Sequence, residues 1–191
     1  IKVASIPKER IQVYFIDNEE YFKRKATFTD ENGELFPDND ERAIFFAKGV
    51  VETVKKLNWA PDIIPVHGWM ASLLPMSLRK VYADEPLFAD SKIVTSIYGV
   101  GFDGHLNKDL GKKIAFDKVG DDNLSGLDNP TYNNLLKVAV DPSDAVILAA
   151  EDIPDDLTEY VANLKKPVLP YVPLQELEEA NANFYNTEVL N

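Results

Sequence analysis

The sequence contains no cysteine among its 191 residues. This absence excludes disulfide bonds, thiolate metal sites and a cysteine nucleophile, and it does not distinguish a reducing from an oxidising compartment. Long hydrophobic runs are also missing, since Lys, Asp, Pro or Gly interrupts every apolar stretch before the roughly 18 residues that a membrane helix needs. We therefore expect a protein without a membrane partner, whose chemistry comes from other side chains.

Positive charge is scarce, with 20 Lys and Arg against 32 Asp and Glu and a formal net charge of −12. The basic residues are scattered in small groups, so the chain repels phosphate backbones and nucleic acid is not an expected partner. Histidine occurs only twice. A zinc site would need both His and carboxylates, and neither His stands in a Ser–His–Asp context. We expect no metal, no cofactor and no catalytic residue.

An initiator Met is also missing, because the chain begins Ile1-Lys2-Val3 with strand-like alternation and no signal-peptide pattern. We interpret this start as a loss of upstream sequence. With 45% hydrophobic residues, the chain is long enough for one sizeable core. We therefore expect a single domain over residues 1–191.

Hydrophobic periodicity predicts strands that alternate with helices along most of the chain. Strands are expected at residues 1–6, 11–16, 62–66, 93–97, 145–149 and 168–172. Helices are expected at residues 38–58, 70–82, 109–116, 131–140, 155–164 and 174–185. Asp38-Asn39-Asp40 and Asp155 supply the capping oxygens of two of these helices. The alternation indicates an α/β, Rossmann-like, three-layer domain with a mainly parallel sheet covered on both faces.

Four segments together carry a family resemblance. They are residues 13–46, the run Trp59-Ala60-Pro61-Asp62-Ile63-Ile64-Pro65-Val66-His67-Gly68-Trp69, the run Ile97-Tyr98-Gly99-Val100-Gly101-Phe102-Asp103-Gly104, and residues 134–146. In this order and spacing, over roughly residues 10–150, they resemble the N-terminal half of bacterial glycogen and starch synthases. Those enzymes are two-domain glycosyltransferases of the GT-B fold. The resemblance implies a cytoplasmic protein of carbohydrate metabolism.

The resemblance implies an α-glucan ligand in a cleft at the carboxyl ends of the parallel strands, where open α/β sheets place their sites. The residues that we expect to bind the glucan or its glucose units are His67, Trp69, Tyr98, Asp103 and Tyr21. A partner protein or a second copy of the chain is the other expected partner.

The chain departs from the family where functional groups are expected. Gly68 replaces the Asp of His-Asp-Trp, and Tyr98-Gly99 replaces the His-Asn of Ile-His-Asn. Where the family has Val-Ser-Pro, this chain has Ala149-Ala150-Glu151. The Lys-Thr-Gly-Gly loop that approaches the nucleotide phosphates is absent from these residues, and after about residue 172 only one helix fits. We therefore expect that the first strand and the donor-binding domain of a synthase are not part of this chain.

Each candidate also has a purely structural interpretation. Trp69 is equally suited to packing on the core and His67 to a structural hydrogen bond, while glycines 99–104 suit a sharp turn. Tyr21-Phe22 with Arg24 is equally consistent with a hydrophobic anchor beside a salt bridge. His105 matches no motif. The pair Asp121-Asp122 and the residues Asp152, Asp155 and Asp156 are interpreted as solvated loop and helix-start charge rather than acid/base or metal sites.

Three functions remain open from these residues. The first is a glycogen/starch synthase-like protein that binds or regulates glucan without catalysis, which the motif losses favour. The second is a component of an active nucleotide-sugar glucosyltransferase that needs missing sequence or a partner to extend α-1,4-glucan. The third is a protein-interaction scaffold without affinity for sugar.

Overall fold

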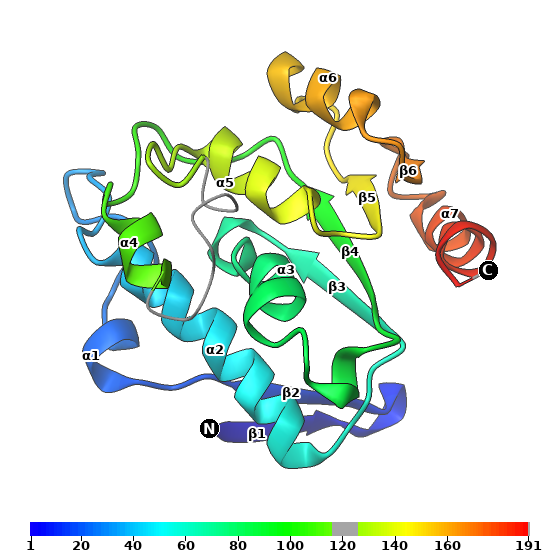
Figure 1. The fold of residues 1–191 in the computed structure, drawn as a ribbon, viewed down its shortest axis with the longest axis horizontal. Helices are drawn as coiled ribbons and strands as arrows, with labels where there is room; N and C mark the ends of the chain where they lie inside the picture. The colour runs from blue at the N-terminus through cyan, green and yellow to red at the C-terminus, as the bar shows by residue number, and fades with distance from the viewer. Residues whose placement is uncertain (116–125, 191) are drawn as a thin grey trace.

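The structure is a computed structural model that describes residues 1–115 and 126–190. Four parallel strands form its central sheet in the order β3-β4-β5-β6, with β3 (Ile63–His67), β4 (Lys92–Ile97), β5 (Ala145–Leu148) and β6 (Val168–Leu169) (Figure 1). The predicted α/β class with a parallel sheet is confirmed. β6 is shorter than the expected 168–172, because Pro170 and Pro173 have no N–H to continue a ladder.

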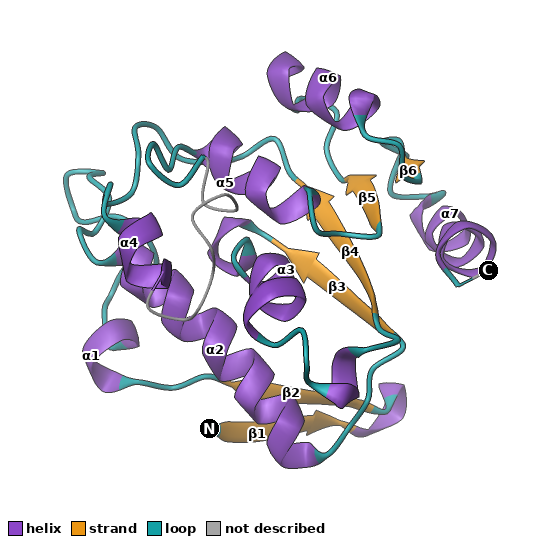
Figure 2. Cartoon of the chain, in the orientation of Figure 1, coloured by secondary structure: helices purple, strands orange, loops and turns teal. Residues whose placement is uncertain are grey.

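Helices cover both faces of this sheet, unequally (Figure 2). One face carries α2 (Asn39–Leu57), α3 (Leu74–Met76), α5 (Tyr132–Val140) and α6 (Asp155–Asn163) around the main core. The other face carries α7 (Leu177–Phe184) and the π turn that follows it, Tyr185–Val189. Side chains of β4 and β5 alternate between the two cores, as a strand with two buried faces requires: Ile93 and Val146 face the first, Val94 and Ala145 the second.

The first two strands lie outside this sheet. Both strands were predicted, and β1 (Lys2–Ile6) and β2 (Ile11–Phe15) form an antiparallel hairpin joined through the 3₁₀ turn Pro7–Glu9. Ile16 lies directly over α2, because a Cβ on Gly49 would come within 2.7 Å of Ile16 Cγ2. Glycine at position 49 therefore permits the close approach of the hairpin to the helix.

The segment expected as one helix at residues 70–82 is divided into a 3₁₀ turn (Trp69–Ala71), α3 and a π turn (Ser77–Val81). Pro75 stands at the start of α3, where its missing N–H cannot bond back into the preceding turn. A further 3₁₀ turn, Pro86–Phe88, leads into β4.

Two expected capping roles are wrong in detail. Asp38 precedes α2 but makes no side-chain capping bond, since its carboxylate is paired with the Arg24 guanidinium. α6 is preceded by Pro154, so Asp155 is its first helical residue rather than its cap. Thr131 does cap α5, where its hydroxyl accepts a hydrogen bond from the Asn134 N–H. The remaining helices are α1 (Glu19–Phe22) and α4 (Leu110–Ala115).

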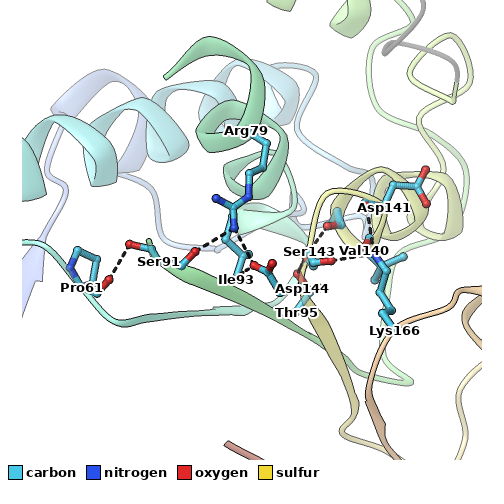
Figure 3. Close-up of polar contacts among 11 residues, drawn as sticks. Pro61, Arg79, Ser91, Ile93, Thr95, Val140, Asp141, Ser143, Asp144 and Lys166 are labelled. Carbon is cyan, nitrogen blue, oxygen red and sulfur yellow. Dashed lines mark hydrogen bonds and ion pairs between the residues drawn. The ribbon is translucent and has the colours of Figure 1, made fainter. Parts of the chain in front are cut away.

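Polar side chains fasten the strands together at the amino end of the sheet (Figure 3). One Asp144 oxygen, Oδ2, accepts hydrogen bonds from the Ile93 N–H and from Arg79 Nη2, both at 2.7 Å. The Asp144 N–H donates to Ile93 O at 2.8 Å. Lys166 donates to the carbonyl oxygens of Val140 and Ser143, each at 2.7 Å, which connects the approach to β6 with the end of α5.

We predict that Asp144→Ala lowers the free energy of unfolding by about 1–3 kcal/mol, because the buried Ile93 N–H loses its side-chain acceptor. Asp144→Asn keeps a neutral acceptor and should cost less. Urea unfolding measures both. Asp90→Ala, at an exposed position, is the matched control. Equal stabilities of the Asp144→Ala and Asp90→Ala proteins would show that this carboxylate does not fasten the sheet.

Candidate functional site

The carboxyl ends of β3 and β4 bring two predicted residues together. His67 is the last residue of β3 and pairs in register with Ser96, two residues before Tyr98. His67 Nδ1 and Tyr98 Oη lie 2.9 Å apart in a hydrogen bond whose direction depends on the imidazole tautomer. The Tyr98 carbonyl accepts a hydrogen bond from the Tyr132 hydroxyl of α5, which anchors the backbone at the end of β4. The two side chains are thus held in contact by the sheet register.

His67 and Tyr98 line a cavity of about 450 Å³ between the carboxyl ends of the strands and the C-terminal segment. Strand residues form one side of this cavity, and residues 169–185 form the other. The lining consists of Pro65, His67, Ser96, Tyr98, Ile147, Leu148, Ala149, Leu169, Pro170, Tyr171, Val172, Leu174, Leu177, Asn181 and Tyr185. None of these lining residues is Asp, Glu, Lys or Arg, so the cavity is a neutral site with a few polar groups on apolar walls.

Partial burial favours the neutral forms of three side chains in the cavity, His67, Tyr98 and Tyr185. It lowers the pKa of His67 and raises the pKa of Tyr98. The pKa of Tyr185 is raised by burial first and by the neighbouring Tyr98 second. A neutral imidazole and two neutral phenols can both donate and accept hydrogen bonds, which suits an uncharged ligand rich in hydroxyl groups.

Trp69 does not face this cavity. Its side chain is only 6% exposed and packs against Phe28 and Phe102, with ring centroids 4.8 and 5.0 Å away. The position of Trp69 therefore agrees with the alternative that the sequence left open, in which this side chain packs on the core. Both neighbours come from loops, so Trp69 anchors the loop before α2 and the glycine-containing loop after β4.

Tyr21 is also separate from the His67–Tyr98 cavity. It lies on α1, where its ring packs against Phe45 at a centroid distance of 5.4 Å and its hydroxyl donates to Glu41 Oε2. Arg24 forms an ion pair with Asp38 nearby. This arrangement agrees with the alternative that the sequence left open, a hydrophobic anchor at Tyr21-Phe22 beside a salt bridge.

Asp103 lines a different hollow, of about 510 Å³, together with Gly99, Gly101, Phe102, Gly104, Thr131, Tyr132, Asn133 and Pro154. The glycines here allow close packing. A Cβ at Gly99 would lie 2.1 Å from Asp152 Oδ1, and one at Gly101 would lie 2.4 Å from the Tyr132 ring. Gly104 has a φ of +79°, which favours glycine.

The other candidates take structural positions. His105 Nδ1 lies 2.7 Å from Leu106 O, and Asp156 contacts Asn133 and Lys137. Asp121 and Asp122 lie outside the described residues. Within residues 1–115 and 126–190, no cluster of three or more His, Asp and Glu side chains is arranged to hold a metal ion. In the same ranges, every helix is too short or too polar to cross a membrane.

Sequence reasoning missed the residues that the C-terminal segment contributes. Asn181 and Tyr185 line the His67–Tyr98 cavity, and Asn181 Oδ1 is buried without a hydrogen-bond partner among the described residues. An asparagine and a tyrosine on an amphipathic helix carry no special signal. Only the docking of α7 on β4 and β5 brings them to His67.

Comparisons with known proteins agree with this fold and with the resemblance of the motifs. The sequence profile of the starch synthase catalytic domain matches residues 1–162. The chain is 38% identical over 159 residues to the glycogen synthase of Chlorobium phaeobacteroides, a match that covers 82% of this chain and 32% of that protein. It is 34% identical over 191 residues to the glycogen synthase of Pelodictyon phaeoclathratiforme, covering 97% of this chain and 36% of that protein.

A shorter match has higher identity. The glycogen synthase of Chlorobium limicola is 43% identical over 120 residues, which are 62% of this chain and 24% of that protein. The chain thus spans about a quarter to a third of the length of the curated relatives that it matches. The profile match covers most of the chain, and the parallel sheet flanked by helices is that of a Rossmann-like half of a GT-B glycosyltransferase. The chain therefore belongs to the starch synthase catalytic domain family and is glycogen synthase-like.

Proposed function

We propose that this chain is a non-catalytic relative of the glycogen synthases that binds α-glucan, with glucose units held in the His67–Tyr98 cavity. The observation that carries the proposal is the neutral lining of that cavity. Apolar walls accommodate the C–H faces of a pyranose ring, and the His67, Tyr98 and Tyr185 side chains offer hydrogen bonds to its hydroxyl groups. The buried Asn181 Oδ1, which lacks a partner among the described residues, supplies an acceptor for one further hydroxyl.

The same lining argues against a nucleotide diphosphate in this cavity. A diphosphate needs cations or converging backbone amides, and the lining residues include no Lys or Arg. A saccharide carries no formal charge, so it can bind without cations or converging backbone amides.

Two family positions support the non-catalytic part of the proposal. The family's Asn at position 99 would require the Asp152 side chain to move, since a Cβ there would collide with its carboxylate and would also lie 3.0 Å from the Asp152 carbonyl oxygen. The family's Asp at position 68 would be strained, because Gly68 has a φ of +76°. Restoring the family side chains would therefore cost backbone strain at position 68 and a rearrangement of Asp152 at position 99.

We predict that glycogen in a native gel retards the protein, and that Tyr98→Ala and His67→Ala weaken the retardation. Each removes a hydrogen-bonding group from the cavity, worth about 0.5–1.5 kcal/mol or up to about tenfold in affinity. His105→Ala is the matched control, because His105 does not line this cavity. Trp69→Ala tests packing rather than binding, since Trp69 is buried.

Unretarded migration of the wild-type protein would contradict glucan binding, and together with a failed glucose-transfer assay it would leave the protein-interaction scaffold as the remaining function. Equal retardation of the Tyr98→Ala, His67→Ala and wild-type proteins would place any glucan site elsewhere.

One observation favours the second candidate, a component of an active glucosyltransferase. The chain spans only a quarter to a third of its relatives' length. In this second candidate, the groups that hold the sugar nucleotide belong to the part of a glycogen synthase that these residues do not cover. Our proposal predicts that the purified chain transfers no labelled glucose from ADP-glucose or UDP-glucose to glycogen. The measurement is radiolabel retained on precipitated glycogen, with the chain alone and mixed with candidate partner proteins. Incorporation above the protein-free blank would replace our proposal with this one.

A further inference from the structure

Trp59 is an exposed tryptophan held in a defined position. Its side chain is 57% exposed, against 6% for Trp69, although tryptophans are usually well buried. Backbone bonds close the end of α2, with Asn58 N–H donating to Lys55 O and Trp59 N–H to Val54 O, and Asn58 has a φ of 48°. These are the two bonds of a Schellman motif, which fixes the backbone directly after a helix. Trp59 is therefore presented to solvent by a rigid element.

Polar side chains from the hairpin lie opposite Trp59. Arg10, Gln12 and Tyr14 line a hollow of about 480 Å³ together with Leu57 and Trp59. Gln12 and Tyr14 are two residues apart on β2 and so share one face, and the Tyr14 hydroxyl donates to Gln12 Oε1 at 2.6 Å. Figure 1 shows the β1–β2 hairpin beside the carboxyl-terminal half of α2.

Most of the hydrogen-bonding capacity in this hollow is unused. The Tyr14 bond occupies the Gln12 carbonyl and leaves both N–H groups of its amide as donors. Among the residues that the structure describes, Arg10 forms no ion pair, so its five N–H donors are also available. The hollow thus combines an exposed indole face with a row of donors, and it has no acidic side chain in its lining.

We propose that this hollow, the Trp59 platform, is a second saccharide site, in which a pyranose ring packs on the indole and its hydroxyls bond to Gln12, Arg10 and Tyr14. The indole offers a large, rigid apolar face to the C–H groups of the sugar. The identity of the sugar, glucose units of an α-glucan, rests on the function proposed above.

The platform and the His67–Tyr98 cavity lie at opposite ends of the same strand. Trp59 precedes β3, whose five residues end at His67, so a strand length of about 16 Å separates the two sites. A branched polymer can occupy both sites at once, whereas a single glucose can occupy only one. The structure therefore predicts stronger binding to glycogen than to short oligosaccharides, through avidity.

Acrylamide quenching of tryptophan fluorescence tests the platform in the wild-type chain, which has only two tryptophans. Without ligand, quenching should report mainly the exposed Trp59. Saturating maltoheptaose or glycogen should protect this emission and shift it to shorter wavelength, while glucose-free buffer and mannitol should not. Unchanged quenching at saccharide concentrations that retard the protein in a gel would overturn the platform.

Variants separate the platform from the cavity. Trp59→Ala should weaken glycogen retardation by about tenfold or more, and Gln12→Ala, at an exposed position, should weaken it in the same direction. The emission of the buried Trp69 reports whether each variant has folded. Phe15→Ser is the matched control, because Phe15 is an exposed aromatic residue on the opposite face of β2.

The two proposals fail in different ways. If Tyr98→Ala abolishes retardation while Gln12→Ala and a folded Trp59→Ala protein behave as wild type, the platform is wrong and the cavity stands. If saccharide protects Trp59 and Tyr98→Ala has no effect, the cavity is wrong and the platform stands. If saccharide neither protects Trp59 nor retards the protein, both are overturned.

Discussion

The Asp144 carboxylate joins the two central strands of the sheet, β4 and β5, at their amino ends. It accepts from the first buried amide of β4 and from Arg79, and its own N–H returns a bond to Ile93 O. One residue thus joins the start of β5, the start of β4 and the turn after α3 (Figure 3). The neighbouring pair, β3 and β4, is joined at the same end by the Lys92 N–H, which donates to Asp62 O, and by the Ser91 hydroxyl, which donates to Pro61 O. Because parallel strands keep a constant register, these bonds at the amino end also determine which residues meet at the carboxyl end.

At that carboxyl end, the register places His67 beside Tyr98, and α7 closes the space above them. The resulting cavity is neutral although the chain carries a net charge of −12, because every lining residue is apolar or uncharged and burial keeps His67, Tyr98 and Tyr185 in their neutral forms. The profile of the starch synthase catalytic domain ends at residue 162, so the residues of α7 that line the cavity lie beyond the matched region. The ligand preference that we propose therefore depends in part on a segment beyond the family profile, although the match to the Pelodictyon phaeoclathratiforme glycogen synthase covers 97% of this chain.

Much of the fold could be predicted from periodicity and turn chemistry. α2 ends within a residue of its predicted boundary, since Lys55 and Lys56 suit its carboxyl end and Asn58 adopts the left-handed conformation that stops it. The apolar runs of β4 and β5 were recognisable because strands buried on both faces are rich in apolar residues, and β3 was recognisable from the run Ile63-Ile64-Pro65-Val66 although only Val66 of it is buried. The prediction was wrong where proline removes a backbone donor, as at Pro75 within an expected helix and Pro170 at the end of β6.

The sequence by itself determined the α/β class and the family, because the alternation of elements along the chain and the spacing of motifs can be read locally. It predicted His67 and Tyr98 for one cleft, and the pairing of β3 with β4 brought them into contact. The tertiary structure alone decided which aromatic residues face solvent. Trp69 lies inside between Phe28 and Phe102, and Trp59 lies outside at the end of α2. It also decided that Asn181 and Tyr185 reach the cavity. The physical reason is that burial depends on contacts between segments far apart in the chain, which no local pattern records.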